Sequence, residues 1–234
     1  MSTVQIHHHD RWHEVVLNRP ERKNAITGPL ASELAAAIKA ATIDDNCEVI
    51  LLRGAGGAFC SGLDLTDFSA DPTPDWMPQF QSLWRDVHRQ LYRSPKTLIL
   101  ALERFAINAG AALAFAADLV VTSPSAFLQV GEVQRGMAAP YNLAWLNLRY
   151  PETLRAQLTL VGRRFSGEEL KQFGIAYECV ADADVVSRAQ ALAQELAAYP
   201  PGALATIKRG LRAHSEPDAD RWFDRLLPTE QHNA

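Results

Sequence analysis

Two segments rich in glycine and other small residues could present unpaired backbone amides to a ligand. The first, Arg53-Gly-Ala-Gly-Gly-Ala-Phe-Cys-Ser-Gly62, follows an apolar run and leads into a polar segment at 63–67. The second, Phe105-Ala-Ile-Asn-Ala-Gly-Ala-Ala-Leu113, follows another apolar run and predicts a helix that begins near Asn108. Glycine lets backbone N–H groups point outward, and the first turn of a helix leaves N–H donors unpaired at its positive end. Two such sites together can stabilise an oxyanion that develops during a reaction.

Three other functions of glycine-rich loops are excluded because the residues that they require are absent from the first segment. A dinucleotide-binding fingerprint would need glycine where Phe59 stands, and a Walker A loop would end in Gly-Lys-Ser/Thr. A serine-hydrolase elbow would need Gly-x-Ser-x-Gly, but Ser61 stands in Phe59-Cys-Ser-Gly-Leu63. An ordinary tight loop remains the alternative for the first segment, and close helix packing remains the alternative for the second.

The elements that must position these segments are strands that alternate with helices, followed by helices alone. Hydrophobic patterning predicts strands at 3–6, 12–17, 49–52, 97–102, 119–122 and 126–130. A helix starts at Thr27 or Gly28, and further helices are expected at about 79–93, 109–117, 140–149, 152–161, 167–172, 185–198, 202–213 and 218–227. Residues 69–78, punctuated by proline, are expected to form a surface loop. This order predicts an α/β fold with a helical C-terminal portion.

Length and composition limit the classes of protein to which the chain can belong. With 234 residues, 47% hydrophobic and 21% charged, it is expected to form one large domain, or one domain with a small appendage. Disorder is excluded as the general state, because disorder requires low hydrophobicity and high net charge. The net charge of −4 argues against nucleic acid as a partner, since phosphate binding favours a basic excess.

Targeting and membrane signals are also missing from the sequence. The first ten residues contain no apolar core of a secretory signal, and four polar residues interrupt the long apolar stretch at 97–121: Glu103, Arg104, Asn108 and Asp118. Three cysteines without metal-ligand spacing indicate a reducing compartment. The sequence therefore predicts a cytoplasmic protein without a membrane partner.

Two further clusters could suggest chemistry, but each has a simpler interpretation. His7-His8-His9 with His13 could suggest a metal ion, yet neighbouring residues on a strand alternate between its faces, so at most two of them converge. A polar strand edge is the favoured interpretation, and no metal site is predicted. Cys60 could act as a thiol nucleophile, but no His–Asp partner lies in an obvious motif, so a small buried packing residue is favoured.

Three segments together resemble the enoyl-CoA hydratase/isomerase (crotonase) superfamily in their order and spacing. They are Leu17-Asn-Arg-Pro-Glu-Arg-Lys-Asn-Ala-Ile26, the segment from Arg53 to Leu65, and the small-residue segment that ends in Ala116-Ala-Asp-Leu119. The resemblance covers roughly residues 3–213 and implies an α/β, crotonase-like spiral of ββα units with a shortened C-terminal helical region. It implies a spiral core over 1–185 and a helical region used for trimerisation over 186–234. The implied assembly is a homotrimer or a dimer of trimers.

The resemblance also implies the substrate and the residues that bind it. The substrate would be carried as a coenzyme A thioester, with no permanently bound cofactor, and its carbonyl oxygen would be held by the N–H groups of Leu63 and Ala109. Lys23 is a candidate for the nucleotide phosphates, with a solvated loop lysine as the alternative. The residues expected along the acyl-CoA are Lys23, Ala25, Ser61, Gly62, Asp64, Leu65 and Gly110.

The acid–base groups separate the possible reactions. The family's hydratases use two glutamates; the first position falls on Ala112, and the second falls on Glu132 in Gln129-Val-Gly-Glu-Val-Gln-Arg-Gly136. Hydration of an enoyl thioester needs a base and a well-placed acid, whereas one carboxylate can move a double bond by shuttling a proton. The single glutamate resembles the pattern of the isomerases, although hydration stays open. A decarboxylase or hydrolase on the same scaffold also stays open, as does a binding subunit with degraded catalysis.

Tyr141 and Glu103 are the remaining candidates near this chemistry. Ala138-Ala-Pro-Tyr-Asn142 resembles the methylmalonyl-CoA decarboxylase branch, in which a tyrosine assists the reacting carboxylate; a tyrosine packed at the start of a helix is the alternative. Glu103 stands where the family commonly has asparagine, and a role as a displaced carboxylate is conceivable but not favoured. Asn108 replaces a usual glycine, and asparagine tolerates positive φ better than most residues, so the turn is expected to survive.

Overall fold

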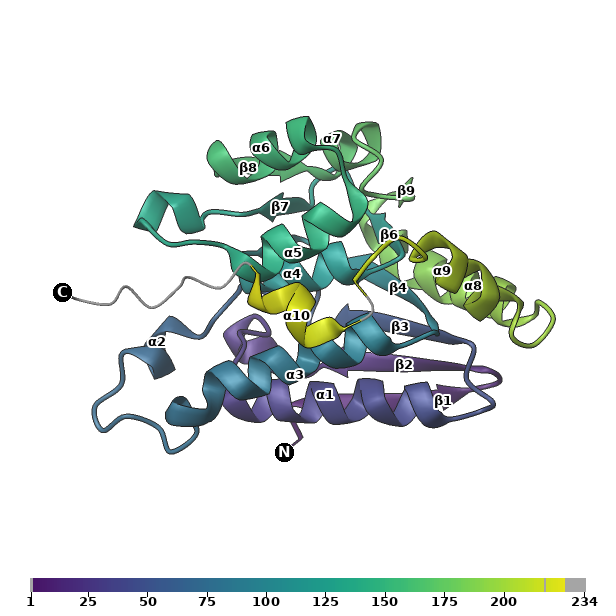
Figure 1. The fold of residues 1–234 in the computed structure, drawn as a ribbon, viewed down its shortest axis with the longest axis horizontal. Helices are drawn as coiled ribbons and strands as arrows, with labels where there is room; N and C mark the ends of the chain where they lie inside the picture. Colours follow the sequence, from purple (N-terminus) through teal and green to yellow (C-terminus); the bar gives the residue numbers. More distant parts are fainter. Residues whose placement is uncertain (1, 217, 226–234) are drawn as a thin grey trace.

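Two sheets form the framework of the computed structural model, which describes residues 2–216 and 218–225 (Figure 1). The larger sheet has the order β1-β2-β3-β4-β6-β9, in which β1 and β2 are antiparallel and every later pair is parallel. Its strands are β1 (Val4–His9), β2 (Trp12–Leu17), β3 (Val49–Gly54), β4 (Thr97–Leu102), β6 (Leu119–Thr122) and β9 (Glu178–Cys179). The smaller sheet pairs β7 (Phe127–Gln129) with β5 (Phe105–Ile107) and β8 (Arg164–Ser166).

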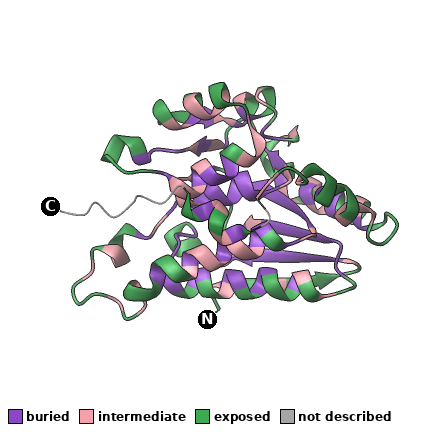
Figure 2. Cartoon of the chain, in the orientation of Figure 1, coloured by how far each residue is buried: buried purple, intermediate pink, exposed green. Residues whose placement is uncertain are grey.

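Helices cover both faces of the larger sheet, as its apolar strands require. Ile50 and Leu52 of β3 face a core shared with α1 (Gly28–Ile43), α3 (Phe80–Arg93), α4 (Ala109–Ala116) and α5 (Pro140–Arg149). Val49 and Leu51 point to the opposite face and pack with α8 (Val185–Ala197). Successive strand residues face opposite sides, so a strand buried on both sides is a nearly continuous apolar run. Figure 2 shows the central strands β2, β3 and β4 buried along most of their length.

The other helices complete the surface of the fold. They are α2 (Leu65–Phe68), α6 (Glu152–Leu160), α7 (Gly167–Gln172), α9 (Ala203–Leu211) and α10 (Ala219–Asp224), with short 3-10 turns η1 (Pro20–Arg22), η2 (Met77–Gln79), η3 (Glu132–Arg135) and η4 (Asp182–Asp184). α10 packs against α3 and α5, and α7 contacts β8 and β9. None of the described helices combines the length and the apolar character that a membrane span needs.

Local sequence signals explain the helices that carry the site. Thr27 caps α1 through its side chain, which accepts a hydrogen bond from the Leu30 amide, and Pro29 occupies the first turn. α4 is buried from Gly110 to Ala116, as its small apolar residues predict. α3 buries one face, formed by Phe80, Trp84, Val87, His88 and Leu91 with Tyr92 beside it.

Most elements predicted from the sequence are confirmed within a few residues. The sequence did not predict β5, β8, β9 or the one-turn helix α2, which contain only two to four residues each. β1 extends to His9 because its whole length pairs with β2. Of the helix predicted at 218–227, the structure contains α10, while residues 226 and 227 lie outside the described residues. The division between a core at 1–185 and a helical region at 186–234 stays a prediction.

Candidate active site

The two amide-presenting segments meet through backbone contacts at the carboxyl ends of β3 and β4. Cys60 donates its N–H to Phe105 O at 3.1 Å, and Ile107 donates its N–H to Cys60 O at 3.1 Å. Gly110, the second residue of α4 (Ala109–Ala116), packs against this contact, and a Cβ atom at Gly110 would lie 2.8 Å from Cys60 O. The close helix packing that the small residues permit is therefore confirmed, and presentation of the first amides to a ligand stays a prediction.

Leu63 and Ala109, the predicted oxyanion donors, flank this contact. Gly62 has φ +95°, and a Cβ there would lie 2.9 Å from Ile107 O, so glycine is required both for the turn and for the close approach. Ile26 bridges to Leu63 through Gly62 O and Asp64 N, which leaves the Leu63 N–H facing away from Ile26. Ala109 is the first residue of α4. Within residues 2–216 and 218–225, no acceptor is assigned to either amide.

The residues expected along acyl-CoA lie on two paired segments. Ser61 donates its N–H to Lys23 O at 3.1 Å, and Ile26 donates to Gly62 O at 2.8 Å, which holds residues 23–26 against 61–64. Lys23 and Leu65 are exposed, whereas Ala25 is buried between them. The structure therefore brings the predicted set together.

Asp64, a member of that set, already has partners for its carboxylate. It accepts hydrogen bonds from Arg22 at 2.9 Å and from Arg19 at 3.1 Å, and it caps α2. Burial disfavours the charged form, but the hydrogen bonds from Arg22 and Arg19 outweigh burial and lower the pKa of Asp64. Its side chain thus holds the loop 19–25 against the turn at 62–64.

Glu132 is a buried carboxylate with a single side-chain donor. It lies at the start of η3 and is 8% exposed. Asn142 Nδ2 donates to Glu132 Oε1 at 2.9 Å, while Glu132 Oε2 is buried without an assigned partner among the described residues. Burial raises the pKa of Glu132, and the bond from Asn142 opposes this rise only in part. A buried carboxyl group with a raised pKa and one unpaired oxygen is suited to accept and return a proton.

Asn142 and Asn108 connect Glu132 to the turn at 108–110, which contains the predicted donor Ala109. Asn142 Nδ2 also lies 3.2 Å from Asn108 O, so one amide group contacts both Glu132 and the residue before Ala109. The Gly131 amide donates to Asn108 Oδ1 at 2.8 Å. Asn108 has φ 50°, which confirms that asparagine supports the turn in place of glycine. The sequence did not predict that Asn142 contacts Glu132. The feature that could have indicated it is the position of Asn142 in the first turn of a predicted helix, ten residues after Glu132.

Ala112 and Glu103 are the two positions considered for a second catalytic carboxylate. Ala112 is fully buried in α4, so this position is apolar. Glu103 lines a different hollow with Arg104, Ser123 and other polar residues, apart from the surroundings of Glu132. Burial raises the pKa of Glu103. Within the described residues, the Glu132 carboxylate is linked through Asn142 to Asn108, the residue before Ala109.

Tyr141 lies in an aromatic cluster formed by α3, α5 and α10. Its ring stacks on His88 at 4.4 Å and lies 5.6 Å from Phe223, and burial raises the pKa of its hydroxyl. His88 accepts a hydrogen bond from Trp145 Nε1 on Nδ1 at 2.8 Å, and burial lowers its pKa to about 3. The packing interpretation of Tyr141 is thus consistent with the structure, and its catalytic role stays a prediction.

Cys60 is a packing residue, as the sequence favours. Its side chain is fully buried, and the Sγ atom lies 3.2 Å from Asn24 O. Burial raises the pKa of the Cys60 thiol to about 12, so the thiolate needed for nucleophilic attack is not formed near neutral pH.

Comparison with known proteins assigns this chain to a family. The sequence profile described as enoyl-CoA hydratase/isomerase matches residues 12–224, and the chain belongs to that family, the crotonase superfamily, whose members include hydratases and isomerases. It is 33% identical to a 1,2-epoxyphenylacetyl-CoA isomerase of Escherichia coli K12, over 90% of this chain and 82% of the relative. It is 31% identical to a protein described as an enoyl-CoA hydratase from Rhodobacter capsulatus, over 85% of this chain and 77% of the relative.

Solved structures agree with the assignment. An enoyl-CoA hydratase from Mycobacterium tuberculosis H37Rv superposes with a TM-score of 0.80 at 27% identity, over 97% of this chain and 89% of the other. A protein from Thermobifida fusca YX, described as an enoyl-CoA hydratase and solved in complex with CoA, has a TM-score of 0.80 at 26% identity over 96% and 90% of the two chains. The chain is therefore an enzyme of the hydratase/isomerase family with the crotonase fold.

Proposed function

We propose that this enzyme binds an acyl-CoA thioester and stabilises its enolate with the N–H groups of Leu63 and Ala109, while Glu132 moves the proton. Both amides strengthen their hydrogen bonds as negative charge appears on the thioester oxygen, so they favour the enolate over the ground state. These roles belong to the backbone, so the side chains of leucine and alanine do not interfere. Loss of one such donor typically costs about 3–4 kcal/mol of transition-state stabilisation.

The observation that carries the proposal is the state of Glu132. Its Oε2 is buried and unpaired, its pKa is raised, and the position of a second glutamate is occupied by the buried Ala112. One carboxylate can remove a proton from carbon 2 of a 3-enoyl thioester and return it to carbon 4, which moves the double bond to carbons 2 and 3. The single carboxylate favours isomerisation ahead of hydration; of the two relatives, one is named an isomerase of 1,2-epoxyphenylacetyl-CoA and the other an enoyl-CoA hydratase.

Residues around the paired loops would bind the rest of the substrate. We place the acyl-CoA along Lys23, Ala25 and the turn at 61–65, with the exposed Lys23 ammonium near the nucleotide phosphates. The CoA complex of the Thermobifida fusca protein supports this class of ligand. The proposal needs no resident cofactor, and it includes assembly as a homotrimer or a dimer of trimers. Tyr141 is a second catalytic candidate, which would act only if the substrate carries a free carboxylate.

A panel of CoA esters tests the proposal. Purified enzyme is incubated in D2O with 2-enoyl, 3-enoyl and malonyl-type CoA esters, and deuterium at the acyl α-carbon is measured by mass spectrometry. Exchange and conversion of the 3-enoyl ester are expected, and both should be lost in Glu132→Gln. Calorimetry with the same esters gives the complementary result: binding without exchange in the wild type would indicate a binding subunit, and absence of binding would refute the acyl-CoA assignment.

A further inference from the structure

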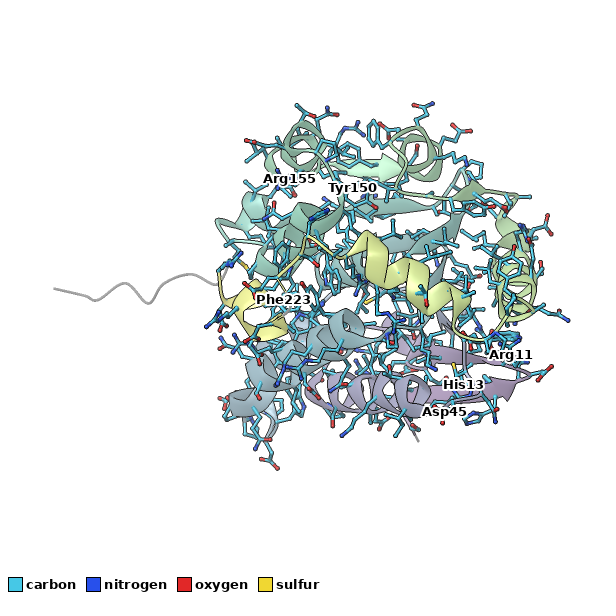
Figure 3. All side chains as sticks on the ribbon, turned by 45° about the vertical axis from the view of Figure 1, so that its right-hand side comes forward. Arg11, His13, Asp45, Tyr150, Arg155 and Phe223 are labelled. Atoms are coloured by element: carbon cyan, nitrogen blue, oxygen red, sulfur yellow. The ribbon has the colours of Figure 1, made fainter. Side chains whose placement is uncertain are left out.

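The β1–β2 hairpin and the end of α1 bring three metal-binding side chains together. His8 and His13 are directly opposite in the antiparallel register, so their side chains share one face. Their nitrogen atoms, His8 Nδ1 and His13 Nε2, lie 3.1 Å apart. Asp44 follows α1 and places Oδ2 at 3.1 Å from His13 Nε2. Figure 3 shows His13 and Asp45 at the same end of the molecule, away from Phe223.

Hydrogen bonds alone do not explain why the side chains of His8 and Asp44 both approach the same nitrogen of His13. His13 Nε2 carries either one hydrogen or one lone pair, so it can make one good hydrogen bond, yet two polar atoms approach it at 3.1 Å. The three ligand atoms lie within 4.8 Å of one another. In a tetrahedral zinc site with Zn–N bonds of about 2.0–2.1 Å, neighbouring ligand atoms are roughly 3.3 Å apart. The two separations from His13 Nε2, each 3.1 Å, are close to this value, so a cation between the three atoms could take all of them as ligands.

The surroundings hold two of the three ligands in place. His13 is 5% exposed, and Asp44 Oδ1 accepts a hydrogen bond from the Asn46 amide at 2.9 Å, which leaves Oδ2 directed to His13. Lys96 donates to the main-chain oxygen of Asp44 at 3.0 Å and is the cation that opposes metal binding here. His8 is exposed and Asp44 is partly exposed, so an ion and a water ligand can reach the cluster from solvent.

We propose that His8 Nδ1, His13 Nε2 and Asp44 Oδ2 form a site for a divalent transition-metal ion, with Zn²⁺ as the preferred ion and water in the fourth position. Two imidazoles and one carboxylate are a donor set that zinc accepts readily. The ion would fasten the β1–β2 hairpin to the end of α1. This site lies far from Leu63, because α1 begins beside the candidate active site and is about 24 Å long. It does not depend on the proposed function.

The sequence predicted a polar strand edge and no metal at this hairpin. It correctly limited the converging histidines to two, but the third ligand comes from a residue about thirty positions further along the chain. Only the pairing of the hairpin and the packing of α1 on β2 bring Asp44 to His13. The metal prediction therefore changes because of a tertiary contact.

Zinc titration of the full-length, tag-free protein tests the site. Calorimetry with ZnCl2 and absorption spectroscopy with CoCl2 should give one equivalent bound, with the visible bands of a four-coordinate cobalt centre. His8→Ala and Asp44→Asn should each weaken binding at least tenfold, while His7→Ala, on the neighbouring residue whose side chain faces the other way, should leave it unchanged. Equal binding by His8→Ala and wild type, or an equal loss in His7→Ala, would overturn the assignment.

Thermal unfolding provides an independent readout. An ion that binds only the folded state raises the melting temperature, so Zn²⁺ should raise it in the wild type and in His7→Ala but not in His8→Ala. The metal-free melting temperatures of the two variants should be similar, because both side chains are exposed. Saturable binding together with this selective shift supports the site, and a wild type that shows neither refutes it.

Discussion

Glu132 and Asp118 are two enclosed carboxylates with opposite electrostatic surroundings. Asp118 lies 2.6 Å from Lys208 Nζ and 2.9 Å from Arg149, with Arg212 at 3.8 Å, and the Leu98 amide donates to it at 2.9 Å. Glu132 is less exposed to solvent and has Asn142 as its side-chain donor. Burial disfavours the charge of both groups, but Lys208 and Arg149 outweigh it at Asp118 and lower the pKa to about 2.

The difference distinguishes a carboxylate held in the charged form from the one that we propose as the acid–base group. Asp118 ties the start of β6 to α5 and α9, and its partners fix it in the charged form. Glu132 has no cation within salt-bridge distance among the described residues, so burial raises its pKa and no counter-charge fixes it in the charged form. Partners, more than depth of burial, decide which role a carboxylate has in this fold.

The largest effect is expected from Glu132→Gln. If Glu132 is the acid–base group, its replacement should reduce kcat for the active CoA ester by about 10²–10⁴-fold, because general acid–base catalysis contributes that range. Steady-state kinetics on the folded variant measures the loss. Glu103→Gln is the matched control and should retain activity, since Glu103 lines a different hollow. Equal losses in both variants would contradict the distinction between the two glutamates.

Asp118→Asn should have the opposite effect to Glu132→Gln: it should lower the free energy of unfolding and leave kcat nearly unchanged. The variant leaves Lys208 and two arginines without their counter-charge, which we expect to cost about 3 kcal/mol of unfolding free energy. Urea unfolding followed by circular dichroism measures this cost. Arg188→Gln breaks the more exposed pair with Glu178 and should cost less than about 1 kcal/mol. A stable Asp118→Asn variant would mean that the cluster around Asp118 does not anchor α9.

The stability of Glu132→Gln relative to wild type should change with pH in a defined direction. Because burial raises the folded-state pKa of Glu132 above its ordinary 4.5, the protonated group is favoured at low pH, and this contribution is lost as pH rises through the folded pKa. The glutamine variant should therefore gain stability relative to wild type between pH 4 and pH 8. The contribution of Asp118 has the opposite sign, since it is present above pH 3.8 and is lost as pH falls toward about 2. Denaturation midpoints of Glu132→Gln above pH 4, and of Asp118→Asn between pH 4 and about pH 2, each compared with wild type, check the two signs.

Asn142→Ala should give the smallest effect and defines Asn142 as a positioning residue. Loss of the donor to Glu132 Oε1 raises the pKa of Glu132 further, so the acidic limb of the rate profile should move to higher pH. We expect about a tenfold loss of activity, equivalent to about 1.4 kcal/mol, with a larger loss at pH 6 than at pH 8. Asn147→Ala, exposed on the same helix, should leave the profile unchanged. A uniform loss at every pH would assign Asn142 a purely structural role.

Local sequence patterns predicted the strands and helices that carry this site, but not the hydrogen bonds between its residues. Apolar runs identified β3 and β4, and the small residues of α4 identified a helix that packs closely, because those signals lie within one element. β5 and β9 are too short to show periodicity and exist through pairing with distant strands. The bond from Asn142 to Glu132 and the approach of Asp44 to His13 depend on tertiary packing, which residue spacing does not encode.

The backbone bridge between Cys60 and Ala106 has a consequence for the order of folding. α1 can form within one stretch of chain, whereas the two amide-bearing turns meet only after the intervening residues 61–105 have closed into a loop. During refolding, helical circular dichroism should therefore recover before catalytic competence. Enzyme activity thus reports the completion of long-range assembly, which helical content by itself does not.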